Sequence, residues 1–171
     1  MNRTSYAFVA LIALATAAPA HAGELFGGVY VHDVKLPTDD SGIESGADLQ
    51  LGYRGGGILH TPLQPYAFAA LNTAGNTNYA AVGLSAKFGG ALYIRPGLGL
   101  AVQTGSAGQY YRPDKIAFGS RVLFEPELAI GTQVAPLVSV EASWVHMSHA
   151  QLFSRENPGI DNLGVRLNLK I

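Results

Sequence analysis

The chain has 171 residues, a net charge of −1 and 13% charged residues, so no basic surface recommends nucleic acid as a partner. It has no cysteine, which excludes disulfides, thiolate catalysis and cysteine-ligated metals. Its 21 glycines, eight tyrosines and seven phenylalanines, with few charges, favour a β-rich protein over a helical one.

The first 22 residues have the three parts of a secretory signal peptide. Arg3 supplies a positive start, residues 7–18 form a short apolar core, and the string AHA at 20–22 fits a small-x-small cleavage site. This segment is too short for a membrane-spanning helix. The sequence therefore predicts a cleaved signal peptide and one exported domain over residues 23–171.

After the signal, apolar and polar side chains alternate with a period of two, in segments of about ten residues separated by Gly, Pro, Asn and Asp. None of these segments offers the roughly 20 continuous apolar residues of a helical span. Strands of this length cross a bilayer in a β-barrel, and eight is the smallest common strand number in outer membranes. The segments expected to form strands are 25–34, 46–55, 64–73, 78–88, 91–103, 120–132, 136–147 and 161–171.

Along the chain, the alternation repeatedly separates an apolar face from a face that carries charges. In 120–132, for example, Phe124 and Leu128 share an apolar face against Glu125 and Glu127. A soluble β-sandwich would hide its apolar face and expose its charged one. The export signal, the strand lengths and inward charges of both signs favour the membrane instead. We therefore predict an all-β fold, an eight-stranded antiparallel transmembrane β-barrel in the outer membrane.

The charged face would line the lumen, which in an eight-stranded barrel is only wide enough for side chains. We expect an internal ion-pair network rather than an open channel, which disfavours a porin or a ligand-binding barrel. For the same reason, Glu125 and Glu127 fit ion pairs better than an acid/base pair. The residues expected in the network are Asp48, Arg54, Arg95, Arg121, Glu125, Glu127, Glu141 and Arg166.

Polar residues interrupt the apolar face near the C-terminus. In the seventh segment this face runs through Trp144, so the same parity puts His146 and Ser148 on the lipid side. In the last segment, parity also turns Asp161 outward. If the barrel starts in the periplasm, odd-numbered strands run outward, and these residues lie at the level of the outer leaflet. The connection over about 148–160 is then an extracellular loop.

The spacing suits nucleophilic catalysis, because residues i and i+2 of a strand lie about 7 Å apart and paired strands about 4.8 Å apart. Ser148 would attack, His146 would take and return the proton, and Asp161 would orient and stabilise the imidazolium. The alternative is a set of polar residues tolerated at the rim of a barrel. His32 and His60 are too distant in sequence to suggest a metal site.

Two strings near the C-terminus carry a family resemblance. HMSHA at 146–150 and ENPGID at 156–161 resemble the pattern His-x-Ser-Asn-Ala-Gly, then Asn-x-Gly-Ile-Glu/Asp, of the outer-membrane lipid A 3-O-deacylases, the PagL family. The string GSRVLFEPELAIG at 119–131 resembles the preceding barrel strand of that family. The specific matches are concentrated after residue 119, whereas strand number and length agree over the whole exported domain.

The resemblance assigns roles position by position. It implies that His146 is the base, that Ser148 is the nucleophile and that Asp161 takes the place of an acid that is Glu in some members. Asn157 matches the asparagine of the loop before the acid. The reaction implied is hydrolysis of the ester-linked 3-hydroxyacyl chain at the 3-position of lipid A in the outer leaflet, without a cofactor. Lipopolysaccharide and outer-membrane lipid are then the partners, and a homodimer is left open.

Two departures from the family pattern adjoin the nucleophile. His149 stands where Asn is usual, and Gln151 stands where Gly is usual. The resemblance implies that these positions help to form the oxyanion hole, where loss of a donor costs about 10²–10³ in rate. The departures keep open a non-catalytic structural or adhesin-like barrel, or an inactive homologue.

Overall fold

The structure is a computed structural model that describes residues 23–36, 42–108, 113–153, 155 and 157–171. The predicted signal peptide lies outside these residues. Within them, no helix is both long enough and apolar enough to cross a membrane. A short 3-10 turn, η1 (Ile58–His60), lies in the connection between the second and third strands.

Strands make up most of the described chain, and their bounds agree with the predicted segments to within a few residues. They are β1 (Glu24–Val31), β2 (Ala47–Arg54), β3 (Leu63–Asn72), β4 (Tyr79–Ala86), β5 (Phe88–Gly89), β6 (Leu92–Gln103), β7 (Val122–Ala135), β8 (Val138–Met147) and β9 (Ile160–Lys170).

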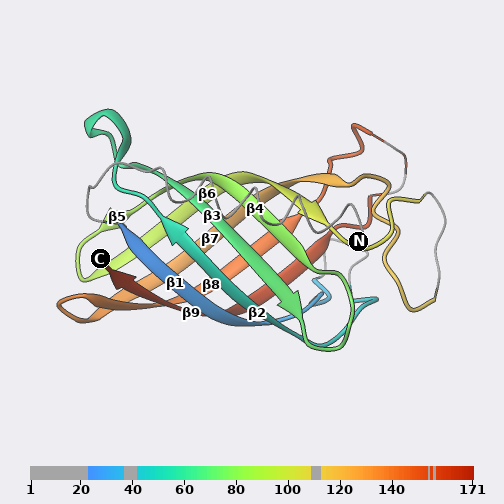
Figure 1. Ribbon diagram of the computed structural model, residues 1–171, viewed down its shortest axis with the longest axis horizontal. Helices are drawn as coiled ribbons and strands as arrows, with labels where there is room; N and C mark the ends of the chain where they lie inside the picture. Colours follow the sequence, from blue (N-terminus) through green and yellow to red (C-terminus); the bar gives the residue numbers. More distant parts are fainter. Residues whose placement is uncertain (1–22, 37–41, 109–112, 154, 156) are drawn as a thin grey trace, which may run out of the picture.

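The strands form one antiparallel sheet that closes on itself into a barrel (Figure 1). β9 pairs with β1, and β4 pairs with β6 to complete the cylinder. The two-residue β5 continues β4 beyond Lys87 along the same partner strand, β6, so nine strands make eight spans. The predicted eight-stranded antiparallel barrel is therefore confirmed.

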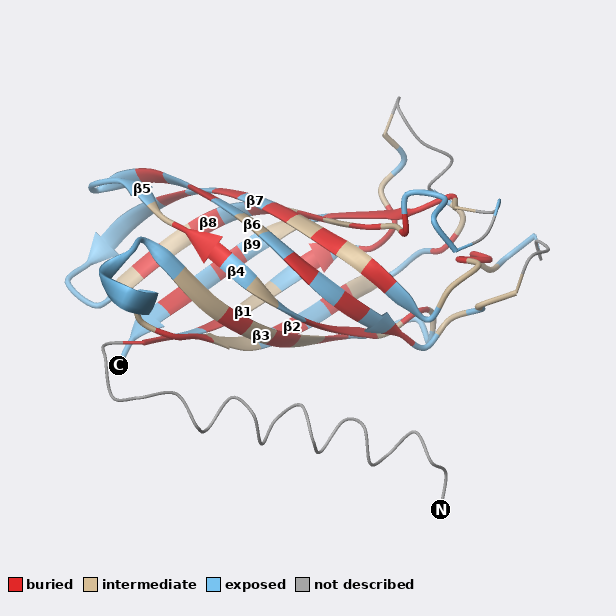
Figure 2. Ribbon diagram, turned by 90° about the horizontal axis from the view of Figure 1, so that it is seen from above, coloured by how far each residue is buried: buried red, intermediate tan, exposed pale blue. Residues whose placement is uncertain are grey.

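The two faces of the barrel differ in chemistry, and exposed and buried residues alternate along its strands (Figure 2). Outward aliphatic side chains such as Leu51, Leu98 and Val165 are 71%, 62% and 55% exposed. Inward Arg54 and Arg166 are 0% exposed. An aliphatic surface this continuous is suited to hydrocarbon rather than to water. We call this outward-facing side of the strands the outer wall.

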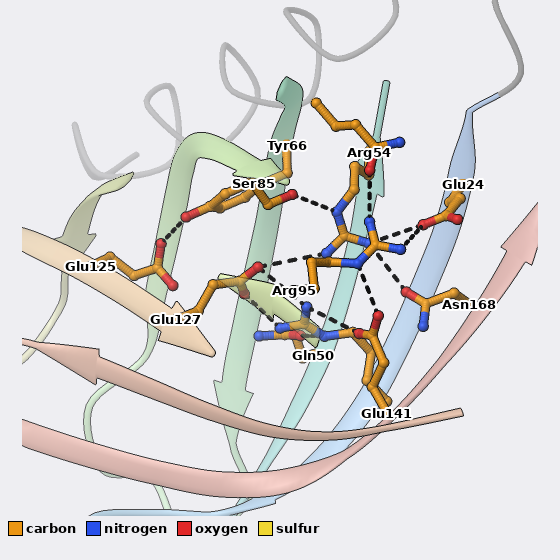
Figure 3. Close-up of polar contacts among 12 residues, drawn as sticks. Glu24, Gln50, Arg54, Tyr66, Ser85, Arg95, Glu125, Glu127, Glu141 and Asn168 are labelled. Carbon is orange, nitrogen blue, oxygen red and sulfur yellow. Dashed lines mark hydrogen bonds and ion pairs between the residues drawn. The ribbon is translucent and has the colours of Figure 1, made fainter. Parts of the chain in front are cut away.

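Ion pairs occupy part of the lumen (Figure 3), beside a hydrophobic cluster that includes Phe26, Phe68 and Val145. Glu24 Oε2 accepts from Arg54 at 3.1 Å and from Arg95 at 2.9 Å. Arg166 donates to Glu127 at 2.8 Å. These groups are almost completely buried, so each charge depends on its partners for solvation. The expected internal network is confirmed, and Glu24, one residue before the first predicted strand, is an additional member.

Two further expected members lie in the lumen with different kinds of partner. Glu141 contacts Arg95 Nε at 3.0 Å and belongs to the network. Glu125 instead accepts a hydrogen bond from the Tyr66 hydroxyl (Figure 3). Glu125 and Glu127 are therefore held by different groups, in keeping with a structural rather than an acid/base role.

Two expected members lie outside this central network. Asp48 is buried but pairs with His32 at 2.9 Å rather than with an arginine. The prediction for Arg121 was wrong, because β7 begins one residue after it and its side chain is exposed. Its guanidinium donates to the backbone carbonyls of Gln103 and Gly105. Arg121 therefore ties together the two ends of the single connection between β6 and β7.

The connections at one end of the barrel are mostly shorter than those at the other end (Figure 1). The end that holds the C-terminus, which we call the turn end, has the connections 55–62, 90–91 and 136–137. The opposite end, which we call the loop end, has the connections 32–46, 73–78, 104–121 and 148–159. The residues singled out near the C-terminus lie at the loop end.

Candidate active site on the outer wall

The pairing of β8 with β9 sets His146 directly opposite Asp161. Directly opposed residues of antiparallel strands share one face of the sheet, and this pair belongs to the outward-facing set. His146 Nδ1 lies 2.9 Å from Asp161 Oδ1. The imidazole and the carboxylate therefore form a hydrogen-bonded pair outside the lumen, with the His146 side chain 22% exposed.

Asp161 is only 1% exposed, although it faces outward. Its Oδ1 accepts a second hydrogen bond, from Trp144 Nε1 at 2.6 Å. The Trp144 ring stacks on the His146 ring, with 5.8 Å between centroids and 29° between planes. A carboxylate on an apolar wall needs such donors, because an unpaired charge there is costly.

Ser148 lies one residue beyond the end of β8 and is held by β7. Its backbone N–H donates to Phe124 O at 3.1 Å, and its carbonyl accepts from Phe124 N at 2.7 Å. Within the described residues, no hydrogen bond joins the Ser148 hydroxyl to His146. The two residues are i and i+2 along one strand direction, about 7 Å apart, and catalytic hydrogen bonds are often long without substrate.

The loop after Ser148 is tied back on itself. His149 N donates to Asn157 Oδ1 at 2.8 Å, so the backbone N–H that follows the serine is engaged within the loop. The His149 side chain is 0% exposed, and its ring centroid lies 5.7 Å from that of Phe153. Asn157 thus supports the loop through the backbone of His149.

A tight turn follows, and one departure from the family pattern, Gln151, lies in it. Leu152 N donates to His149 O at 2.9 Å, and the two central residues, Ala150 and Gln151, have φ of 51° and 58°. This is the left-handed geometry of a type I′ turn, which glycine adopts without strain. Exposed Gln151 therefore occupies the family's glycine position at a conformational cost.

Sequence reasoning missed two contributors. Trp144 was expected only as a member of the apolar face, yet its indole contacts both Asp161 and His146. Gly159, at φ 71°, leaves room for the imidazole, because a Cβ there would lie 3.0 Å from His146 Cε1. The sequence did offer one signal for this contact: Trp144 lies two residues before His146 and therefore on the same face of the strand.

No group of three or more His, Asp or Glu side chains in the described ranges is arranged to hold a metal ion.

Comparison with protein families gives one match relevant to this geometry. The family described as "Lipid A 3-O-deacylase (PagL)" matches residues 38–170, a span that includes the His146–Asp161 pair and Ser148. No curated protein matches the sequence.

Solved barrels share the fold. The crystal structure of the outer membrane enzyme PagL is similar with a TM-score of 0.61 and 22% identity, covering 86% of this chain and 99% of that chain. Neisserial surface protein A has a TM-score of 0.55 and 12% identity, with 87% and 97% covered. The Yersinia pestis outer membrane protein Ail has 0.51 and 10%, with 88% and 99% covered. At these identities the likenesses establish the fold alone.

Proposed function

The chain belongs to the lipid A 3-O-deacylase (PagL) family, and from this premise we propose that it hydrolyses the ester-linked 3-hydroxyacyl chain at the 3-position of lipid A. The observation that carries the proposal is the His146–Asp161 hydrogen bond on the outer wall, two residues from a serine. A barrel whose inward charges are paired has no structural need for this outward pair.

In the proposed reaction, Ser148 Oγ attacks the ester carbonyl while His146 takes its proton. The tetrahedral intermediate collapses, and the 3-oxygen of the sugar leaves with that proton. Water, activated by His146, then attacks the acyl-serine and releases a free 3-hydroxy fatty acid. Asp161 orients the imidazole through Nδ1 and stabilises its charged form in both steps.

The location of the site suits a substrate that stays in its leaflet. Long loops of outer-membrane barrels lie on the cell exterior, so we assign the loop end to that side and the site to the outer leaflet. Acyl chains of lipid A lie against the outer wall there. A nucleophile on that wall can reach an ester near the interface without extracting the lipid. Export by the signal peptide over 1–22 completes this proposal.

The alternative is a non-catalytic barrel of the same family. It is favoured by the engaged N–H of His149, the backbone donor next to Ser148, and by histidine in place of the family's asparagine. Rate is lost when an oxyanion-hole donor is missing, by about 10²–10³. This alternative predicts a folded barrel that leaves lipid A unchanged.

Lipid A mass spectrometry separates the two functions. The full chain is expressed in an outer membrane that contains hexa-acylated lipid A, and the extracted lipid A is weighed. We expect loss of one 3-hydroxyacyl chain with the wild type and none with Ser148→Ala, because no other group supplies the nucleophile.

Ser143→Ala is the matched control, since Ser143 lies on β8, the strand that leads to Ser148, but is buried on the lumen side. It should deacylate like the wild type. Intact lipid A in the presence of a folded wild-type barrel would rule out the proposed reaction.

A further inference from the structure

Trp144 makes a contact that the triad alone does not require. It is paired with Leu163 across β8 and β9, next to the His146–Asp161 pair along the same face. A diagonal neighbour in a sheet lies within reach of an aromatic side chain. The indole uses this reach to place Nε1 2.6 Å from Asp161 Oδ1.

The two carboxylate oxygens of Asp161 differ in their hydrogen bonds. Oδ1 accepts from both Trp144 Nε1 and His146 Nδ1, whereas Oδ2 is buried without a hydrogen-bond partner in the described part of the chain. A carboxylate held only by the imidazole could turn about its Cβ–Cγ bond and offer either oxygen. A second donor on the same oxygen removes that freedom.

The indole ring also restrains the imidazole. Trp144 and His146 stack at 29° between planes, on the side of the pair toward the middle of β8. On the loop side, Gly159 would meet His146 Cε1 if it carried a Cβ, so that backbone lies close as well. The imidazole is therefore bounded on two sides while Nδ1 stays on the carboxylate.

From these contacts we infer that Trp144 is a positioning residue of the site, whose indole N–H fixes the Asp161 carboxylate and whose ring fixes the His146 imidazole. The inference rests on the proposed function. It gives the short aspartate a second anchor at the position where some family members have the longer glutamate. Phenylalanine would keep the ring without the donor.

Trp144 is the chain's single tryptophan, which makes the hydrogen bond directly observable. The ¹H–¹⁵N spectrum of the folded barrel in detergent contains one indole N–H resonance. We expect this resonance to move upfield in Asp161→Ala, where the acceptor is gone, and to keep its position in Ser148→Ala. An indole resonance unchanged by Asp161→Ala would overturn the inference, and this measurement needs no folding of a Trp144 variant.

Kinetics then test the positioning role with Trp144→Phe. The lost bond is to a charged group that acts in the transition state, so we expect kcat to fall about tenfold or more with KM unchanged. Leu167→Ala, an outward substitution on β9 opposite Val140 and away from the pair, is the control and should keep wild-type kcat. An unchanged kcat in Trp144→Phe, or an equal fall in Leu167→Ala, would overturn the inference.

The outcomes distinguish this inference from the proposed function. An active wild type with a fully active Trp144→Phe contradicts the inference and leaves the deacylase intact. A wild type that leaves lipid A intact contradicts the deacylase and with it the kinetic role of Trp144. In that case the indole resonance still decides whether the hydrogen bond exists.

Discussion

At the scale of single residues, the site consists of polar groups placed where the barrel needs apolar ones. Asp161 is outward-facing and 1% exposed, while its strand neighbours Leu163 and Val165 are 39% and 55% exposed. Two N–H donors stabilise its charge in that position. A purely structural barrel gains nothing from this arrangement, because an aliphatic residue at 161 would match the rest of the outer wall.

The turn after Ser148 gives a residue-scale prediction. Gln151→Gly relieves the left-handed strain at φ 58° and should raise the free energy of unfolding by about 0.5–1 kcal/mol. Thermal unfolding in detergent measures the change.

The matched control for the turn is Gln133→Gly, an exposed glutamine inside β7 whose φ is not positive. Glycine there should lower stability, because it increases the backbone entropy of the unfolded chain and removes the side-chain hydrogen bonds from Gln133 to the carbonyls of Ala135 and Pro136. Equal losses in the two variants would show that the turn at Gln151 is not strained.

Strand parity was sufficient to predict which residues share the outer wall. His146 and Asp161 could be placed on one face because a period of two leaves only two choices per residue. Parity does not report how far a side chain reaches, so the Trp144–Asp161 bond could not be predicted. Nor does it fix where a strand begins, which is why Arg121 was misplaced.

At the scale of elements, Glu44 joins the connections of the loop end. Its Oε2 accepts from His32 Nε2 at 3.1 Å and from Thr77 N at 2.9 Å. Its Oε1 accepts from Ile116 N at 3.3 Å. One buried carboxylate thus links three connections, those after β1, β3 and β6. Sequence reasoning did not find this group, because the partners are up to 72 positions apart.

The charge state of His32 makes this junction sensitive to pH. Burial alone would lower the pKa of His32, but the hydrogen bonds to Asp48 and Glu44 outweigh it and raise the pKa to about 9. Because the folded-state pKa is the higher one, the stabilisation is complete below the unfolded value of 6.5 and is lost as pH rises through about 9.

The prediction is tested with His32→Gln. Wild type should exceed this variant in stability by at most about 3 kcal/mol near pH 6, and the gap should shrink toward pH 10. Unfolding at several pH values measures the gap. His60→Gln, an exposed histidine at the turn end, should show little change. A gap that stays constant across this range would contradict the assignment.

At the scale of the whole molecule, the lumen holds a buried ion-pair network beside a hydrophobic cluster that includes Phe26, Phe68 and Val145. Arg166 is 0% exposed and donates to Glu127 at 2.8 Å, and its Nε donates to the Tyr30 hydroxyl at 3.0 Å. Such a network tolerates the removal of a whole pair better than the loss of one partner, which leaves a buried charge uncompensated.

Arg166→Met should therefore lower the free energy of unfolding by about 3–5 kcal/mol. Adding Glu127→Gln to it should recover part of the loss, since it removes a buried carboxylate that has lost Arg166 and keeps only the longer pair with Arg54, at 3.6 Å. Lys170→Met, at the exposed end of β9, should stay within about 0.5 kcal/mol of wild type. Denaturant titration in detergent measures the free energy of unfolding of all three variants. A double variant less stable than Arg166→Met would contradict the account.

The barrel itself could be predicted almost completely, because eight alternating segments specify both the number of strands and which side chains face outward or inward. The contents of the lumen could be predicted only in part. Tyr66 and Tyr93 were not expected among the polar groups, although their hydroxyls bond to Glu125 and Glu141. An aromatic residue in an alternating pattern gives no sign of which partner its hydroxyl will find.

The central claim is that Ser148 is an activated nucleophile on the outer wall. The most direct measurement is the intact mass of the folded barrel after treatment with an alkyl p-nitrophenyl phosphonate, followed by peptide mapping. The account predicts one adduct per chain on Ser148, absent from Ser148→Ala and strongly slowed in His146→Ala. A folded protein that takes no adduct, or takes it on another residue, would contradict it.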